Sequence, residues 1–348
     1  MPDRRLLRRL MRTVGMIVGT FGLLLIVGFL WNVVVVEWQH RRNPVPGGFY
    51  QIDGRVMHLY CTGDGPQTII IEVGGSADWL GWQGVQARLS PLTRVCTYDR
   101  SGHGWSEPRE GARDAEAIVR ELHALLNIAG VPRPLVLAGH SLGGLFVREY
   151  AREFGSEVAG VVLIESSSPH QIDELPGWRQ SYEADVRNFA WQRWRDRLRV
   201  WSGWERLTGH CHNEPSPELQ HLSGQYDAEM CRPAYVDGDQ SELPYFEAAS
   251  SQSARLVSFG DAPLLIISAD PERTRNGMDA SAVAELPIWE QEQEAQKALS
   301  VRSWRVIARG AGHAPHHERL DLIVDEITRL VEYLRGGSAP PFGRTVIE

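Results

Sequence analysis

Residues 135–151 place the tightest constraint on how this chain folds. The apolar run at 135–138 has the length and composition of a buried strand. It leads into Gly139-His140-Ser141-Leu142-Gly143, and amphipathic helical spacing follows over residues 145–151. Such a turn strains the backbone of the central serine, and it needs glycines where side chains would clash. The segment therefore predicts that the Ser141 hydroxyl projects above a sheet, beside a helix N-terminus.

Strand and helix patterns alternate on both sides of this segment. Apolar or β-branched runs predict eight strands, at residues 49–52, 55–60, 68–73, 94–98, 135–138, 158–164, 262–268 and 303–308. Amphipathic spacing predicts helices at 113–128 and 320–334. The alternation breaks between residues 170 and 259, where tryptophans and charged residues gather. We expect an α/β core interrupted by a helical insert.

The turn at Gly139–Gly144 resembles the nucleophile elbow of the α/β-hydrolase superfamily, and the resemblance covers residues 47 to 334. Asp99–Ser106 is similar to the superfamily's D-x-x-G-x-G-x-S loop. The resemblance implies an α/β-hydrolase fold with a mostly parallel, eight-stranded sheet flanked by helices. The expected boundaries are a core at 49–169 and 260–335, a helical cap insert at 170–259 and a loose tail at 336–348.

The same resemblance implies a catalytic triad in the chain order serine, acid, histidine. Ser141 matches the nucleophile, and His313 matches the base because it ends a Gly-x-Gly-His motif after the last predicted strand. The acid stays open between Asp270, Glu165 and Glu272. Asp270 follows the strand that usually carries the acid, whereas Glu165 ends the strand after the elbow helix, where haloalkane dehalogenases place theirs.

An oxyanion hole needs backbone N–H groups that point at the developing negative charge. The loop after the strand at 68–73 supplies one such group in the superfamily, which favours Gly75, and Leu142 after the serine supplies the other. We expect Ser76, Trp82 and His140 to line the substrate site. For Trp82, simple packing is the alternative.

Val14–Val36 is a run of 23 residues without a charge, long enough to cross a bilayer as a helix. A cleaved signal peptide and a buried core helix are the alternatives, but the run is long for a signal peptide and lacks Ala-x-Ala before Glu37. Five arginines precede it, which predicts that residues 1–13 face the cytoplasm. Residues 37–48 would then link a single-pass anchor to an extracytoplasmic catalytic domain.

The four cysteines suit an oxidising compartment. The superfamily's strand order makes the strands of Cys61 and Cys96 neighbours, so these two residues are candidates for a disulfide. Cys211 and Cys231 both lie in the insert and are a second candidate pair. Free buried thiols are the alternative.

Taken together, the sequence predicts a membrane-anchored serine hydrolase of the carboxylesterase or lipase type, acting on small or lipidic esters. An aminopeptidase or C–C bond hydrolase of the same fold and a non-catalytic ligand-binding member are the alternatives. No cofactor or metal motif is present in the sequence, and the net charge of −8 argues against a nucleic-acid partner.

Overall fold

The computed structural model describes residues 4–75, 77–211, 217–232, 238, 241–275 and 280–348. The chain divides into two compact units. One comprises residues 1–45 and 189–237, and the other comprises residues 46–188 and 238–348. The second unit carries the sheet and is described first.

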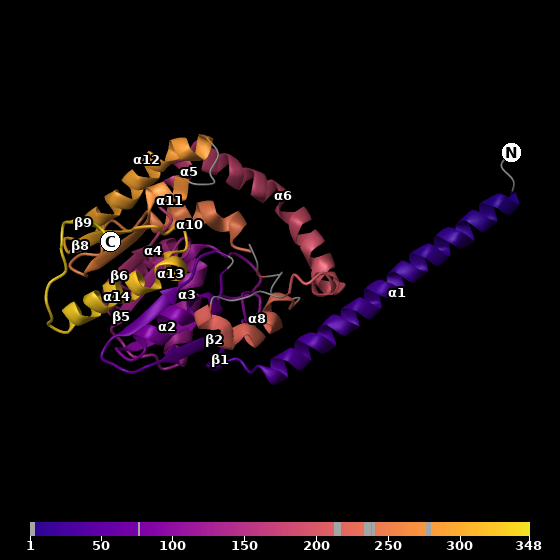
Figure 1. Ribbon diagram of the computed structural model, residues 1–348, viewed down its shortest axis with the longest axis horizontal. Helices are drawn as coiled ribbons and strands as arrows, with labels where there is room; N and C mark the ends of the chain where they lie inside the picture. The colour runs from indigo at the N-terminus through magenta and orange to yellow at the C-terminus, as the bar shows by residue number, and fades with distance from the viewer. Residues whose placement is uncertain (1–3, 76, 212–216, 233–237, 239–240, 276–279) are drawn as a thin grey trace. The chain divides into compact units, whose positions relative to one another are not determined.

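The sheet runs through the second unit with helices on both of its faces (Figure 1). Its strands lie in the order β1-β2-β4-β3-β5-β6-β7-β8-β9. β1 and β2 form an antiparallel hairpin, β2 pairs antiparallel with β4, and every later pairing is parallel. The strands are β1 (Gly48–Ile52), β2 (Arg55–Thr62), β3 (Thr68–Glu72), β4 (Arg94–Tyr98), β5 (Leu135–His140), β6 (Val158–Ile164), β7 (Leu264–Ala269), β8 (Ser303–Ala308) and β9 (Thr345–Ile347).

The prediction of eight strands and a loose tail is wrong in one respect, because β9 adds a ninth strand from the tail. β9 pairs in parallel with β8. Phe342, just before it, packs edge-on against the buried Trp304. The sequence does not predict this strand, because three residues are too few to show a periodic pattern. The polar and proline-rich residues before Phe342 are moreover typical of a loop.

Alternate residues of the central strands feed two separate cores, as the two-residue period of a strand requires. On one face, Ile70 and Leu137 pack with the helices α3 (Ala115–Ile128), α4 (Gly143–Phe154) and α10 (Phe246–Ser253). On the other face, Ile69 and Val136 pack with α2 (Gln83–Leu89) and α14 (Leu320–Leu334). Burial on both faces explains why these strands are continuously apolar.

The remaining helices of the second unit follow the sheet's carboxyl edge or belong to the predicted insert. They are α5 (Gln171–Glu174), the first part of α6 (Pro176–Trp201), α11 (Pro271–Arg275), α12 (Ala280–Ala295) and α13 (Pro315–Glu318). The predicted domain boundaries remain predictions, although the insert is shared between the two units because residues 189–237 cluster with the N-terminal helix.

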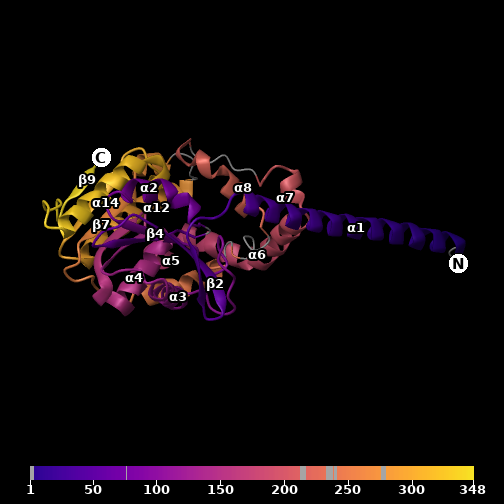
Figure 2. The same ribbon diagram turned by 90° about the horizontal axis from the view of Figure 1, so that it is seen from below.

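The first unit is built on one long helix, α1 (Arg4–Arg42), with the end of α6, α7 (Trp204–Leu207) and α8 (Ser223–Met230) beside it (Figure 2). Residues Arg8–Arg42 of α1 are long and apolar enough to cross a membrane, and an 18-residue window within them has a mean hydropathy of 2.3. Length and composition alone do not separate an anchor from a signal sequence.

Both predicted cysteine pairs form disulfides. Cys61 and Cys96 lie directly opposite each other on β2 and β4 of the second unit. Cys211 and Cys231 join the two segments that flank α8 in the first unit.

Candidate active site

Ser141 lies at the turn between β5 and α4 with a φ of +52°, a conformation that side chains rarely adopt. Close packing forces this turn. A Cβ on Gly143 would lie 2.3 Å from the Glu72 carbonyl oxygen, and one on Gly144 would lie 1.8 Å from Ser166 Oγ. The Ser141 amide donates to the Ile164 carbonyl at 3.1 Å, which ties the turn to the next strand. The predicted glycine requirement therefore has a structural cause.

His313 lies in the loop after β8, and its Nε2 is 3.0 Å from Ser141 Oγ. The sequence separation is 172 residues, so only the parallel order of the strands brings the two side chains together. This distance is a hydrogen bond through which a neutral imidazole accepts the hydroxyl proton.

His140, the residue before the serine, holds the backbone of that loop. Its Nε2 lies 2.8 Å from the His313 carbonyl oxygen. A carbonyl only accepts, so the proton of the neutral ring is on Nε2. Burial, followed by the neighbouring charge of His313, lowers the pKa of His140 to about 3. The neutral His140 ring therefore donates a hydrogen bond to the His313 backbone, and this bond positions His313.

Two of the three candidate carboxylates have different surroundings. Glu165 follows β6 directly, is buried, and has a φ of +41°. Its Oε2 accepts from the Ala269 amide at 2.6 Å, and its Oε1 accepts from Trp289 Nε1 at 2.7 Å. Burial raises the pKa of Glu165, and the positive charge that His313 can carry works against that rise.

Asp270, after β7, accepts hydrogen bonds from nearby backbone amides. It accepts from the Gly310 amide at 2.8 Å and from the Glu272 amide at 2.9 Å. These backbone bonds, the one from Gly310 first, lower its pKa. Glu272 is exposed on α11. Asp270 therefore has the environment of a carboxylate that shapes a turn.

The predicted oxyanion donors lie on adjoining loops. A Cβ placed on Gly75 would be 3.5 Å from the Leu142 side chain. Among the described residues, neither the Gly75 nor the Leu142 amide donates a hydrogen bond, so both are available to a ligand. Ser76, the other candidate on this loop, lies outside the described residues.

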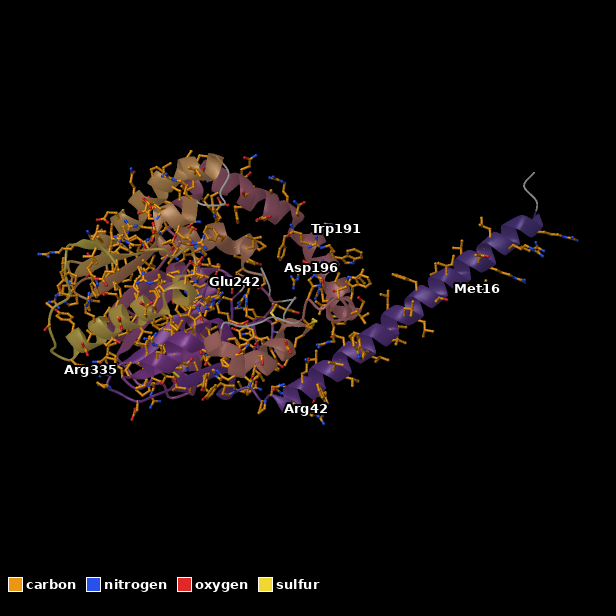
Figure 3. The ribbon with its side chains drawn as sticks, in the orientation of Figure 1. Met16, Arg42, Trp191, Asp196, Glu242 and Arg335 are labelled. Carbon is orange, nitrogen blue, oxygen red and sulfur yellow. A yellow bond between two sulfur atoms is a disulfide. The ribbon has the colours of Figure 1, made fainter. Side chains whose placement is uncertain are left out.

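Arg100 fixes the loop that carries Gly75. Its guanidinium is buried and donates to the carbonyl oxygens of Val73 at 2.8 Å and Gly74 at 2.7 Å. Glu72 and Glu242 neutralise it at 2.8 and 2.7 Å (Glu242 is labelled in Figure 3). The sequence does not reveal this role of Arg100, because its partner Glu242 comes from the far end of the insert.

Trp82 lies beneath this site as a packing residue. It is buried, and its ring stacks on His316 with the centroids 4.1 Å apart. The His316 ring meets His140 edge-on at 4.7 Å. These contacts correspond to the packing alternative for Trp82, in which its ring packs against His316 and His316 packs against His140.

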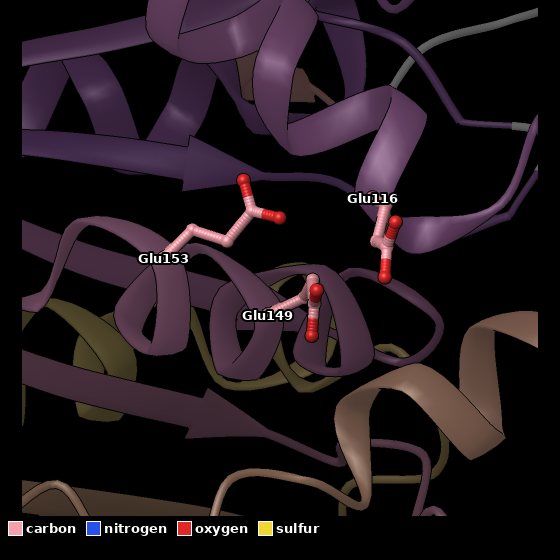
Figure 4. Close-up of side chains that lie close together, drawn as sticks. All are labelled: Glu116, Glu149 and Glu153. Carbon is pink, nitrogen blue, oxygen red and sulfur yellow. The ribbon is translucent and has the colours of Figure 1, made fainter.

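Three carboxylates elsewhere in the second unit lie close enough together to resemble a cation site: Glu116, Glu149 and Glu153 (Figure 4). Arginines already neutralise them. Arg120 bonds Glu153 at 2.8 Å, Arg152 bonds Glu149 at 2.6 Å, and Arg255 bonds Glu116. The cluster is therefore an ion-pair network between helices.

Replacing His140 with glutamine should flatten the pH dependence of stability. The unfolded chain protonates this histidine near pH 6.5, whereas the folded protein keeps it neutral to about pH 3. Below about pH 6.5 the unfolded state therefore binds more protons, and the wild type loses up to about 1.4 kcal/mol per pH unit that His140→Gln does not lose. Thermal unfolding in detergent at about pH 7.5 and about pH 5 measures this difference. Parallel melting-temperature shifts in both proteins would contradict it, and Ile128→Ala on the surface is the control.

Comparisons with known proteins agree with this geometry. The model of the alpha/beta hydrolase family matches residues 69–326. An uncharacterized protein of Schizosaccharomyces pombe is 28% identical over 270 residues, which cover 75% of this chain and 45% of that protein. The chain spans less than half the length of the curated relatives that head its matches.

Solved structures share the fold at low sequence identity. An esterase from Thermogutta terrifontis aligns with a TM-score of 0.56 and 20% identity, over 83% of this chain and 98% of that one. A membrane phospholipase A aligns with a TM-score of 0.52 and 20% identity, over 95% and 99%. With the family model covering most of the sheet and the loops of Ser141 and His313, the chain belongs to the alpha/beta hydrolase family.

Proposed function

We propose that this protein is a serine hydrolase that cleaves carboxylic esters through an acyl-enzyme on Ser141. The observation that carries the proposal is the hydrogen-bond distance of 3.0 Å between Ser141 Oγ and His313 Nε2, at a serine held in a strained turn. An oxygen nucleophile of this kind needs an adjacent base, because a free serine hydroxyl is a weak nucleophile at neutral pH.

In the proposed reaction His313 takes the proton from Ser141 as the hydroxyl oxygen attacks the ester carbonyl carbon. The Gly75 and Leu142 amides stabilise the negative oxygen of the tetrahedral intermediate. The C–O bond of the ester then breaks, and His313 returns the proton to the leaving alcohol. A water molecule, deprotonated by the same histidine, releases the acid and restores Ser141.

We further propose Glu165 as the acid of the triad, in preference to Asp270. The triad acid holds the base in one tautomer and stabilises its positive form. Glu165 is buried, and the positive charge that His313 can carry acts to lower the pKa of this carboxyl. Asp270 is less buried, and its oxygens accept from the backbone amides of Gly310 and Glu272. The hydrogen bonds from Trp289 and Ala269 favour the ionised carboxylate of Glu165 and so oppose the rise in its pKa that burial causes.

For the N-terminal region we propose a single-pass anchor with the catalytic unit outside the cytoplasm. The apolar length of α1 and the two disulfides support this location. The arginines before the apolar run support the orientation.

Turnover of p-nitrophenyl esters, from acetate to palmitate, tests the reaction and measures the preferred chain length. Ser141→Ala should abolish turnover and covalent labelling by a fluorophosphonate probe, because no other group replaces the attacking oxygen. Ser101→Ala, at a buried serine of the neighbouring loop, is the control and should retain the label. A wild-type protein that neither turns over esters nor takes up the probe would favour a non-catalytic role.

The acid is tested by comparing Glu165→Gln with Asp270→Asn, both of which remove charge and keep shape. Glu165→Gln should lower kcat by about 10⁴-fold, since tautomer control of His313 is lost. Asp270→Asn should leave kcat near the wild-type value. The reverse ranking would assign the role to Asp270.

The orientation is tested by fusing alkaline phosphatase, which is active only outside the cytoplasm, to the C-terminus of the full chain. The fusion should be active and should remain in the membrane fraction. Replacing the five arginines that precede the apolar run with glutamate should reduce this activity, because the charge bias sets the orientation. A stable but inactive wild-type fusion would reverse the assignment.

A further inference from the structure

Asn32 fastens α1 to the rest of the first unit. It is fully buried, although it stands within the uncharged run of the helix. Its Nδ2 donates to the carbonyl oxygens of Val200 at 3.0 Å and Cys231 at 3.1 Å, and its Oδ1 accepts from Arg206 Nε at 2.9 Å. Both N–H groups and the oxygen of the Asn32 side-chain amide are hydrogen-bonded. These bonds attach α1 specifically to the end of α6 and to α7.

The attachment continues toward the N-terminus of α1. A Cβ on Gly28 would lie 2.0 Å from the Ser202 carbonyl oxygen, so the two backbones meet there without side chains between them. The Phe29 and Trp201 rings stack with their centroids 5.2 Å apart. Gly203 lies against the ring of Trp31. The turn between α6 and α7 is therefore seated at the level of residues 28–32.

That level lies inside the apolar run. At 1.5 Å per residue, Gly28 is about 12 Å before Val36, the end of the uncharged stretch. A bilayer core takes about 20 helical residues, and counting these from Thr13, the first residue after the last arginine, still reaches Asn32. If α1 spans a bilayer core of ordinary thickness, Gly28 therefore lies in the hydrocarbon region. The turn at Ser202, which contacts Gly28, then lies at the same depth.

The side chains displayed there suit lipid. Trp191, Trp194, Leu198 and Trp201 recur at helical spacing on α6, and Trp204 opens α7. All five are exposed, and we call them the tryptophan face. Trp191 and Trp194 are 62% and 55% exposed and stack on each other at 5.0 Å (Trp191 is labelled in Figure 3). A row of large exposed rings is costly in water but typical of a membrane interface, where the indole body is apolar and its N–H is polar.

The charge of the same segment also fits a lipid headgroup layer. Residues 187–199 contain five arginines and one aspartate. Three of the arginines have acidic partners: Arg187 pairs with Glu183 at 3.6 Å, Arg195 with Asp196 at 2.9 Å and Arg199 with Glu205 at 2.5 Å. The excess positive charge matches the phosphates of the lipids, and it lies next to the apolar rings that would enter the acyl boundary.

We propose that the tryptophan face is a bilayer-inserting surface. It enters the leaflet from which the C-terminal end of α1 emerges, and the lipid interface itself is its partner. This inference rests on the proposed anchoring of α1 and adds that part of the insert is held within the membrane beside it.

The test measures the depth of nitroxide labels in the full chain, reconstituted in nanodiscs of phosphatidylcholine and phosphatidylglycerol. Trp204→Cys carries the informative label, because this residue follows Gly203 and is 54% exposed. Leu24→Cys reports on the middle of the apolar run, and Arg41→Cys, whose side chain is 76% exposed, is the water-side control. The four native cysteines are bonded in disulfides and do not take up the label.

Oxygen partitions into the acyl region and a nickel chelate stays in water, so their relaxing effects on each label give its depth. The Trp204 label should resemble the Leu24 label, with high oxygen and low nickel accessibility, and the Arg41 label should show the opposite. A Leu24 label in the acyl region with a Trp204 label as open to nickel as the Arg41 label would overturn the inference alone. A Leu24 label in water would instead remove the anchor on which the inference rests.

Discussion

The close approach of backbones around Ser141 is the constraint on which the rest of the catalytic unit depends. Gly143 lies against the end of β3 and Gly144 against Ser166 after β6, so three loops meet at one turn. The Leu142 side chain, next to the strained serine, lies beside Gly75. A side chain at either glycine of the turn would push Ser141 away from the loops of Glu72 and Ser166, so the geometry on which the proposed chemistry depends has a steric cause.

Buried polar groups hold the surrounding loops at that turn. Arg100 donates to the carbonyl oxygens of Val73 and Gly74, and His140 donates to the carbonyl oxygen of His313. Both side chains donate hydrogen bonds to main-chain oxygens, and the surroundings of each determine whether it is charged. Arg100 stays charged between two glutamates, whereas His140 is neutral because burial disfavours its charged form. The site is thus preorganised by the body of the sheet.

The first unit answers a different physical problem. A long apolar helix has to end where water begins, and here its last apolar turns are contacted on one side by α8 and by the turn after α6. Asn32 is tolerated in that apolar stretch because two carbonyls and an arginine satisfy it. Exposed tryptophans lie next to this attachment, as the proposed bilayer-inserting surface requires.

The sequence alone predicted the fold and the two cysteine pairs, and it singled out Ser141 and His313, which the structure brings to 3.0 Å from each other. These predictions depend on local pattern and on a strand–turn–helix motif of strong steric demand. The sequence left the acid open, because Glu165 and Asp270 both end parallel strands and only burial and hydrogen bonding distinguish them. It missed β9, whose pairing comes from β8 and not from its own three residues. The bond from Arg206 to Asn32 joins residues 174 apart, and such contacts follow from tertiary packing, which no local spacing encodes.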